Sequence, residues 1–126
     1  MAQKILVIDD SRLVVVMLRD GLENHGYAVL TASDGQEGLQ MVKQDRPDLI
    51  ILDLQMPTMD GYDFVNELEK IQSVRTIPVI MLTADETSHV LIRMKAVNGC
   101  LQKPVHVAEL VSKIRECLSE SSESPS

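Results

Sequence analysis

Cysteine is scarce in this 126-residue chain. The two cysteines, Cys100 and Cys117, lie far apart in the sequence and outside any Cys-x-x-Cys or Cys/His group. A disulfide framework and a zinc site both need paired or clustered ligands, so the sequence argues against both. Reduced thiols in a cytoplasmic protein are the simpler interpretation, and we expect a cytoplasmic location.

Basic residues and long hydrophobic runs are also in short supply. Lysine and arginine number 12 against 19 aspartates and glutamates, which gives a formal net charge of -7. Such a surface repels phosphates, so we expect no nucleic-acid partner and no anionic membrane surface. The apolar runs are far too short for a signal peptide or a membrane span, so we expect no membrane partner.

What the chain does contain is a set of short apolar runs that stop abruptly at polar residues. The three most apolar runs are Ile5-Leu6-Val7-Ile8, Leu49-Ile50-Ile51-Leu52 and Val79-Ile80-Met81-Leu82. The first is followed by Asp9 and Asp10, the second by Asp53 and the third by Thr83. Runs without polar alternation are typical of strands buried on both faces, as in a parallel sheet covered by helices.

Helical patterns separate these strands. The first helical segment has one face of apolar or small residues. These residues are Val14, Met17, Leu18, Gly21 and Leu22. Gly26 can end this helix in a left-handed conformation. Ser33 and Asp34 predict the start of a second helix, and Asp60 with Gly61 the start of a third. We expect a short fourth helix over residues 88–96. The apolar face of the final helix comprises Val107, Leu110, Val111, Ile114 and Leu118.

Two weaker strands complete the pattern. One surrounds Val29, and the other covers residues 100–103 after a turn at Asn98-Gly99. The strand–helix order repeats five times, which predicts an α/β fold with a doubly wound, five-stranded parallel sheet and helices on both faces. The three most apolar strands should be central and the two weaker ones at the edges. We assign residues 1–118 to this domain and expect residues 119–126 to be a mobile Ser/Glu-rich tail or the start of a linker.

Three carboxylates, Asp9, Asp10 and Asp53, should converge at the carboxyl ends of the first and third strands. In open parallel sheets this edge is where ligands bind. Like charges in close contact repel unless a cation neutralises them. An all-carboxylate cluster without His or Cys favours Mg²⁺ over zinc or copper.

Lys103 and Thr83 end two further strands at the same edge. The ammonium of Lys103 could pair with Asp53 or with an anion bound to it, and the lowered cis penalty of Lys103-Pro104 could aim the side chain. Thr83 adds a hydroxyl. Together these groups describe a phosphoryl-transfer site with Asp53 as carboxylate nucleophile.

In these motifs the sequence resembles the receiver domain of two-component response regulators, over roughly residues 3–118. The motifs are Asp9-Asp10, Asp53 followed by Met56-Pro57-Thr58-Met59-Asp60-Gly61, Thr83-Ala84 and Lys103-Pro104. The resemblance implies a flavodoxin-like (βα)5 fold with strand order 2-1-3-4-5. It also implies a signalling phosphoacceptor that catalyses only its own phosphorylation and dephosphorylation.

The same resemblance implies roles for individual residues and partners. Asp53 would accept a phosphoryl group from a sensor histidine kinase or a phosphotransfer protein. Asp10, Asp53 and the carbonyl of Gln55 would bind Mg²⁺ directly, and Asp9 largely through water. Thr83 and Lys103 would bind phosphoryl oxygens. We further expect the face formed by the fourth helix, the last strand and the last helix to contact a downstream protein partner when Asp53 is modified. A phosphorylation-dependent homodimer is a separate possibility.

The sequence departs from the receiver pattern in two places. The start of the last strand commonly carries Tyr or Phe, and that position is Cys100 here. The segment from Thr83 to Lys103 is also shorter than usual. With Cys100 at this position, the signal cannot be relayed by the rotation of an aromatic side chain. We interpret Cys100 as a small buried residue of an edge strand rather than as a redox sensor.

Two other functions known on this fold fit the same residues poorly, and a third stays open. A flavin or nucleotide site needs backbone donors after the first strand, where Asp9 and Asp10 offer carboxylates instead. A phosphohydrolase with an aspartyl-phosphate intermediate usually has a second acid two residues beyond the nucleophile, and that residue here is Gln55. A phosphorylation-independent docking or dimerisation receiver is the remaining alternative, although no acid and no lysine of the motif is lost.

Overall fold

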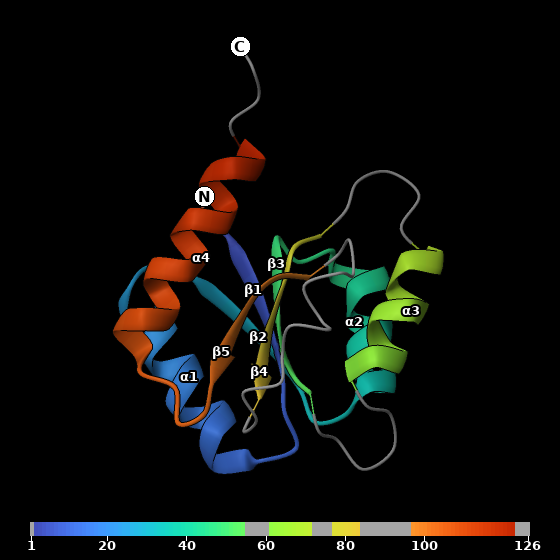
Figure 1. Cartoon of the computed structure of the whole chain (residues 1–126), viewed down its shortest axis with the longest axis horizontal. Helices are drawn as coiled ribbons and strands as arrows, with labels where there is room; N and C mark the ends of the chain where they lie inside the picture. Colours follow the sequence, from blue (N-terminus) through green and yellow to red (C-terminus); the bar gives the residue numbers. More distant parts are fainter. Residues whose placement is uncertain (1, 55–60, 72–76, 84–96, 123–126) are drawn as a thin grey trace.

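A computed structural model describes residues 2–54, 61–71, 77–83 and 97–122 (Figure 1). The elements are β1 (Lys4–Ile8), α1 (Arg12–Asn24), β2 (Ala28–Ala32), α2 (Gly35–Asp45), β3 (Leu49–Asp53), α3 (Gly61–Ile71), β4 (Val79–Thr83), β5 (Val97–Gln102) and α4 (Val107–Ser122). The predicted alternation of strands and helices is confirmed for these elements. The expected helix over residues 88–96, and Asp60 as a helix cap, lie outside the described residues.

The five strands form one parallel sheet in the order β2-β1-β3-β4-β5. Strands β3 and β4 are buried along their whole length, and β1 is buried after its first residue. The edge strand β2 is largely half-buried. Continuous apolar strands need cover on both faces, so they occupy the centre of the sheet, as the sequence predicts.

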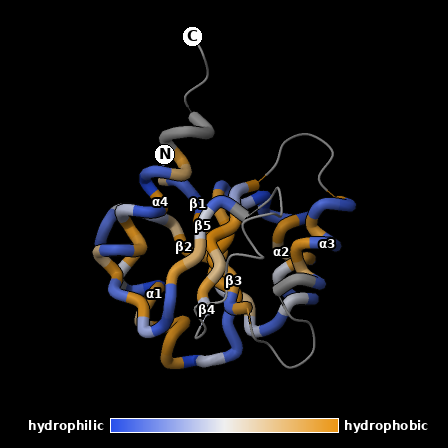
Figure 2. Tube along the Cα trace, viewed as in Figure 1, coloured by the Kyte–Doolittle hydropathy of each residue, from blue (hydrophilic) through white to orange (hydrophobic). Residues whose placement is uncertain are grey.

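Helices cover both faces of the sheet. Helices α1 and α4 lie on one face, and α2 and α3 on the other (Figure 1). Alternate residues of β1 point to opposite faces: Ile5 and Val7 pack with α1 and α4, whereas Leu6 and Ile8 pack with α2 and α3. The apolar residues gather along the sheet and on the helix sides that face it (Figure 2). The carboxyl ends of the strands are therefore held in position by apolar packing on both faces of the sheet.

Helix α1 buries a narrower face than the sequence predicts. Leu18 and Leu22 are fully buried, as expected, but Met17 is 44% exposed. Val15, which the predicted face omits, packs against the core instead. The buried stripe is thus centred on the Leu18–Leu22 row, and Met17 lies on its far flank because one turn of helix spans about 3.6 residues.

Strand β5 begins earlier than expected. Asn98 and Gly99, predicted as a turn, lie inside the strand, where Gly99 pairs with Ile80 after a register shift. The aliphatic part of Lys113 on α4 occupies the space that a side chain at Gly99 would need. An Asn-Gly dipeptide, which usually indicates a turn, here marks a point where a helix side chain packs closely against a strand.

Helix α4 continues to Ser122, so the first four residues of the segment expected as a tail are helical. Residues 123–126 lie outside the described part. The buried face of α4 contains Leu110, Val111, Ile114 and Leu118, as predicted, and Val107 is partly buried. Among the helices of the described residues, none combines the length and the apolar character needed to cross a bilayer.

Candidate functional site

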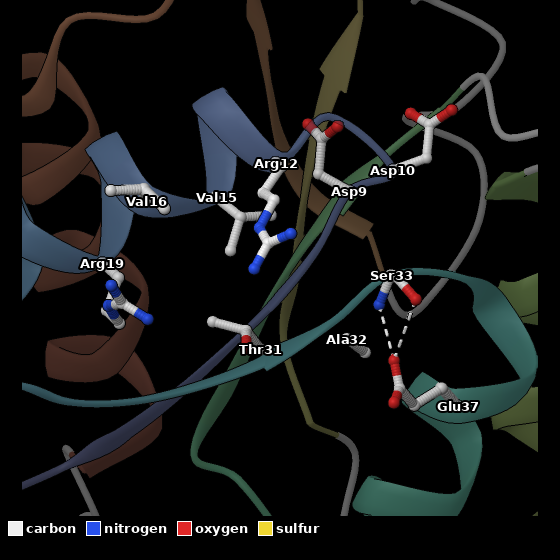
Figure 3. A pocket seen from close by; sticks show the side chains of 10 residues that line it. All are labelled: Asp9, Asp10, Arg12, Val15, Val16, Arg19, Thr31, Ala32, Ser33 and Glu37. Atoms are coloured by element: carbon white, nitrogen blue, oxygen red, sulfur yellow. Dashed lines mark hydrogen bonds between the residues drawn. The ribbon is translucent and has the colours of Figure 1, made fainter.

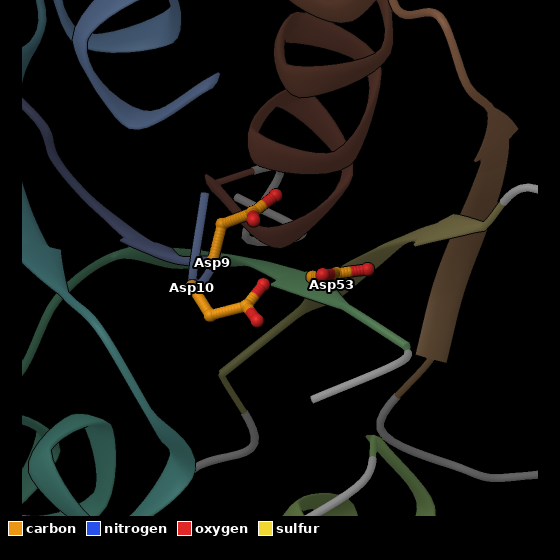
Figure 4. Close-up of side chains that lie close together, drawn as sticks. All are labelled: Asp9, Asp10 and Asp53. Carbon is orange, nitrogen blue, oxygen red and sulfur yellow. The ribbon is translucent and has the colours of Figure 1, made fainter. Parts of the chain in front are cut away.

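The carboxyl ends of β1 and β3 bring three carboxylates together. Asp53 is the last residue of β3, and Asp9 directly follows β1, whose Ile8 pairs with Leu52. One carboxylate oxygen from each of Asp9, Asp10 and Asp53 lies within 4.8 Å of the others (Figure 4). The predicted convergence of these three acids is confirmed.

The three acids differ in their surroundings. Asp9 is 1% exposed and Asp53 4% exposed, whereas Asp10 is exposed to solvent. The backbone N–H of Ser11 donates to Asp9 Oδ1 over 2.8 Å. The Ser11 hydroxyl in turn accepts from the N–H of Val14, 3.4 Å away, and caps α1. The start of α1 therefore fixes the Asp9 carboxylate, a contact that the sequence analysis did not identify.

Lys103 reaches the acidic cluster from the residue after β5. Its Nζ lies 3.2 Å from Asp53 Oδ1 and 3.3 Å from Asp9 Oδ2, so the ammonium bridges the two buried acids. Pairing with Asp53 was predicted, and the contact with Asp9 was not. The Lys103-Pro104 peptide is cis, as the sequence permits. Burial lowers the pKa of Lys103, but attraction to Asp53 and Asp9 outweighs it and leaves the pKa above 10.5.

Thr83 closes the site at the end of β4. It is 3% exposed, and its carbonyl oxygen accepts a hydrogen bond from the backbone N–H of Lys103 over 2.7 Å. This bond joins the ends of β4 and β5 immediately beside the cation. Gln55, the remaining predicted ligand, lies outside the described residues.

The donor set fits a hard divalent cation. Asp9, Asp10 and Asp53 supply carboxylate oxygens, the ligands that Mg²⁺ prefers, and among the described residues the cluster includes no His or Cys ligand. Lys103 compensates part of the negative charge, and Asp10 opens the cluster to solvent. The arrangement can therefore hold a cation next to the Asp53 carboxylate.

A cavity of about 510 Å³ borders the acidic cluster between α1 and the edge strand β2 (Figure 3). Asp9 and Asp10 lie at one end, and Arg12 and Arg19 of α1 contribute guanidinium groups to its wall. On the opposite side, Glu37 accepts hydrogen bonds from the N–H and hydroxyl of Ser33. The sequence analysis did not single out these two arginines, because only the fold turns them toward the site.

Comparison with known proteins agrees with this architecture. The profile of the response regulator receiver domain matches residues 5–115 of the chain. The matched region contains Asp9, Asp10, Asp53, Thr83 and Lys103.

Two relatives illustrate the sequence similarity. The alkaline phosphatase synthesis transcriptional regulatory protein PhoP of Bacillus subtilis is 37% identical over 123 residues, which cover 96% of this chain and 50% of PhoP. The response regulator MprA of Mycobacterium leprae is 38% identical over 117 residues, which cover 91% of this chain and 50% of MprA. The chain thus spans about half the length of these relatives.

Solved structures share the fold over nearly their whole length. The chemotaxis protein CheY4 of Vibrio cholerae superposes with a TM-score of 0.85 at 32% identity, covering 92% of this chain and 98% of CheY4. A CheY-like receiver domain protein of Methanospirillum hungatei gives a TM-score of 0.88 at 25% identity, with 98% of both chains covered.

Proposed function

Because the chain belongs to the receiver-domain family of response regulators, we propose that Asp53 accepts a phosphoryl group from a sensor histidine kinase or a phosphotransfer protein. The observation that carries the proposal is the buried Asp53 carboxylate, held 3.2 Å from the Lys103 ammonium inside a cluster of acids. A carboxylate in this setting is fixed in position and partly neutralised, as a nucleophile toward an anionic phosphoryl group needs to be.

The group transfer needs little acid–base chemistry from the protein. An oxygen of Asp53 forms a bond to phosphorus while the phosphorus–nitrogen bond to the donor imidazole breaks. The electron pair of the broken bond stays on the imidazole nitrogen, which takes a proton from solvent. The chain contributes positioning and charge neutralisation, which dominate catalysis of phosphoryl transfer.

Asp9, Asp10 and Asp53 would hold Mg²⁺, with the carbonyl of Gln55 as a further ligand. When bound, the ion supplies positive charge for the oxygens of the transferring phosphoryl group. Lys103 is charged at neutral pH, and its ammonium, 3.2 Å from Asp53 Oδ1, is within reach of a phosphoryl group on that residue. Thr83 would supply a hydroxyl from the end of β4 to the same group.

The output of this switch would lie on the face formed by β5 and α4. Lys103 directly follows β5, its N–H is bonded to Thr83, and Lys113 of α4 packs over Gly99 of β5. A phosphoryl group on Asp53 that binds Lys103 and Thr83 would therefore shift the ends of β4 and β5. Cys100 is half-buried against the core in the described edge strand, so this route does not depend on a moving aromatic side chain.

The decisive experiment is intact-mass spectrometry after incubation with Mg²⁺ and a small acyl phosphate. We expect one added phosphoryl group, which is lost in the Asp53→Asn variant and in the presence of a chelator. Addition to Asp53→Asn, or addition that does not need a divalent cation, would contradict the proposed chemistry. No addition by the acyl phosphate or by kinase-supplied phosphoryl groups would favour a phosphorylation-independent docking receiver.

The output face has its own test by hydrogen exchange. Phosphorylation should alter amide exchange in β5 and α4 more than in β2, because Lys103 and Thr83 connect to the former. A change confined to the loops around Asp53 would exclude this face as the output.

A further inference from the structure

The cavity between α1 and β2 has a wall that the proposed phosphoryl transfer does not use. Four residues of α1 form this wall: Arg12, Val15, Val16 and Arg19. Their spacing of i, i+3, i+4 and i+7 places them on one side of the helix. The cavity volume of about 510 Å³ is in the range of small-molecule sites, which combine apolar walls with a few polar groups. Two valines between two guanidinium groups therefore resemble the wall of a binding pocket for an organic anion.

The two guanidinium groups are available to a ligand. Figure 3 shows both arginine side chains on the side of α1 that faces Thr31 of β2. Arg12 is exposed, and its guanidinium has no ion pair or hydrogen bond within the described residues. Arg19 has a 3.7 Å contact with Asp20, in which the two side chains are 41% and 64% exposed, so this pair holds it weakly.

The acids that line the cavity leave this positive charge largely uncancelled. Asp9 accepts the N–H of Ser11 with one carboxylate oxygen and contacts Lys103 with the other. The Oε1 atom of Glu37 already accepts two hydrogen bonds. Asp10 has no such partner among the described residues, and it lies at the end of the cavity next to the acidic cluster. The cavity is therefore negative toward Asp10 and positive along α1.

We propose that this cavity binds a small organic phosphate, with its phosphate group between Arg12 and Arg19. An arginine fork offers paired donors that match phosphate oxygens. The Cα atoms of the two arginines lie about 10 Å apart along α1, a span that two long side chains can close around one phosphate. Thr31 offers a hydroxyl from the opposite side, and Val15 and Val16 supply an apolar surface for the body of the ligand.

This site is coupled to the acidic cluster by charge. A phosphate in the cavity and the uncompensated carboxylate of Asp10 repel each other, so each disfavours the other in the metal-free protein. A cation that neutralises the cluster removes this repulsion and favours the ligand, and by linkage the ligand favours the cation to the same extent. The cavity would therefore make metal occupancy respond to a small phosphorylated molecule.

Two-dimensional NMR of the full chain in metal-free buffer tests the site with phenyl phosphate as the probe. This stable ester reports binding without transfer to Asp53. We expect saturable shifts of the Thr31 amide and of the Nε signals of Arg12 and Arg19, with a dissociation constant on the order of 1 mM. Arg12→Gln and Arg19→Gln should each raise that constant about fivefold to tenfold, because each removes a charged donor.

Arg115→Gln is the matched control, since it removes one positive charge at an exposed site on α4 and should leave the dissociation constant unchanged. The amide spectra show whether each variant keeps the fold. Shifts confined to residues around Asp53 and Lys103 would place the probe in the phosphoacceptor site and overturn the proposal. So would equal weakening by Arg115→Gln, or the absence of saturable shifts at about 20 mM probe.

The charge coupling has a separate readout in the same titration. Asp10→Asn should lower the dissociation constant about twofold to threefold, because it removes the carboxylate that repels the phosphate. Glu69→Gln, the same charge change on an exposed side of α3, should have no effect. An equal gain in both variants would show that net charge, rather than the position of Asp10, governs binding, and would contradict the coupling.

Discussion

At the scale of single residues, the three acids of the site are unequally compensated. Asp9 and Asp53 are buried and share the Lys103 ammonium, whereas Asp10 is exposed and has no such cation among the described residues. Without a bound cation Asp10 therefore adds repulsion to the cluster and gains little in return.

Replacing Asp10 by Asn should consequently stabilise the metal-free protein. We expect the free energy of unfolding in urea, with a chelator present, to rise by about 0.5–1 kcal/mol because one like charge is removed. Glu69→Gln on the exposed side of α3 serves as the control for a general reduction of negative charge. An equal gain in both variants would show that the repulsion is not local to the cluster.

Lys103 gives the site a predictable response to alkaline pH. Its pKa is raised in the folded state, so its stabilising contribution is complete below the unfolded value of 10.5 and disappears as pH rises through the folded value. In metal-free buffer near neutral pH, Lys103→Met should lower the free energy of unfolding by on the order of 2 kcal/mol, because Asp9 and Asp53 lose the ammonium that pairs with both. The deficit relative to wild type should shrink above pH 10.5, as measured by urea unfolding. A deficit that stays constant with pH would mean that packing, not charge, accounts for it.

At the scale of elements, two helices approach their neighbours closely where a glycine allows it. Gly38 of α2 lies against Ile8 of β1, and an added Cβ would collide with the Ile8 side chain and come within 3.3 Å of Phe64. Gly21 of α1 faces Val107 of α4 in the same way, with 2.7 Å from an added Cβ to a Val107 methyl group. Gly38 thus sets the distance between α2 and the sheet, and Gly21 sets the distance between the neighbouring helices α1 and α4.

Gly38→Ala should therefore destabilise the fold although alanine is the better helix former. We expect a loss of about 1–3 kcal/mol from overpacking, measured by urea unfolding. The same substitution in an Ile8→Val background should cost less, because the colliding methyl group is gone. A double-mutant cycle without coupling between positions 8 and 38 would locate the strain elsewhere.

The elements themselves were largely predictable from the sequence, and the reasons differ. Continuous apolar runs predicted the central strands correctly, because a strand that is buried on both faces has apolar residues at every position. The start of β5 was not predictable, because Asn98-Gly99 normally signals a turn, and the pairing of Gly99 with Ile80 beneath Lys113 of α4 depends on tertiary contacts. Met17 was misplaced for a similar reason: periodicity identifies a broad apolar side, and packing decides which part of it is buried.

The site was predictable to the extent that it follows strand ends. Asp9, Asp10, Asp53, Thr83 and Lys103 each end or follow a strand, and a parallel sheet brings those ends together. The Ser11 bond to Asp9 and the arginines of the cavity depend on how α1 leaves β1, which residue types alone do not specify.

At the scale of the whole molecule, we expect a net charge of -7 and a cluster of acids to make the stability of the fold depend on divalent cations. Mg²⁺ that binds only the folded state should raise its stability by about 2.7 kcal/mol at a hundred times the dissociation constant. Thermal unfolding should show the increase, and a chelator should reverse it. Asp10→Asn should respond far less, whereas an unchanged response would mean that the ion binds away from these acids.

The span of the Lys103–Asp9 contact, 94 positions along the chain, has a consequence for biosynthesis. Asp53 leaves the ribosome long before the cation that neutralises it, and β5 can join the sheet only after β4 is in place. A polypeptide that ends before Lys103 would therefore carry the Asp9 and Asp53 carboxylates without their counter-charge, which disfavours the folded state until synthesis has passed β5.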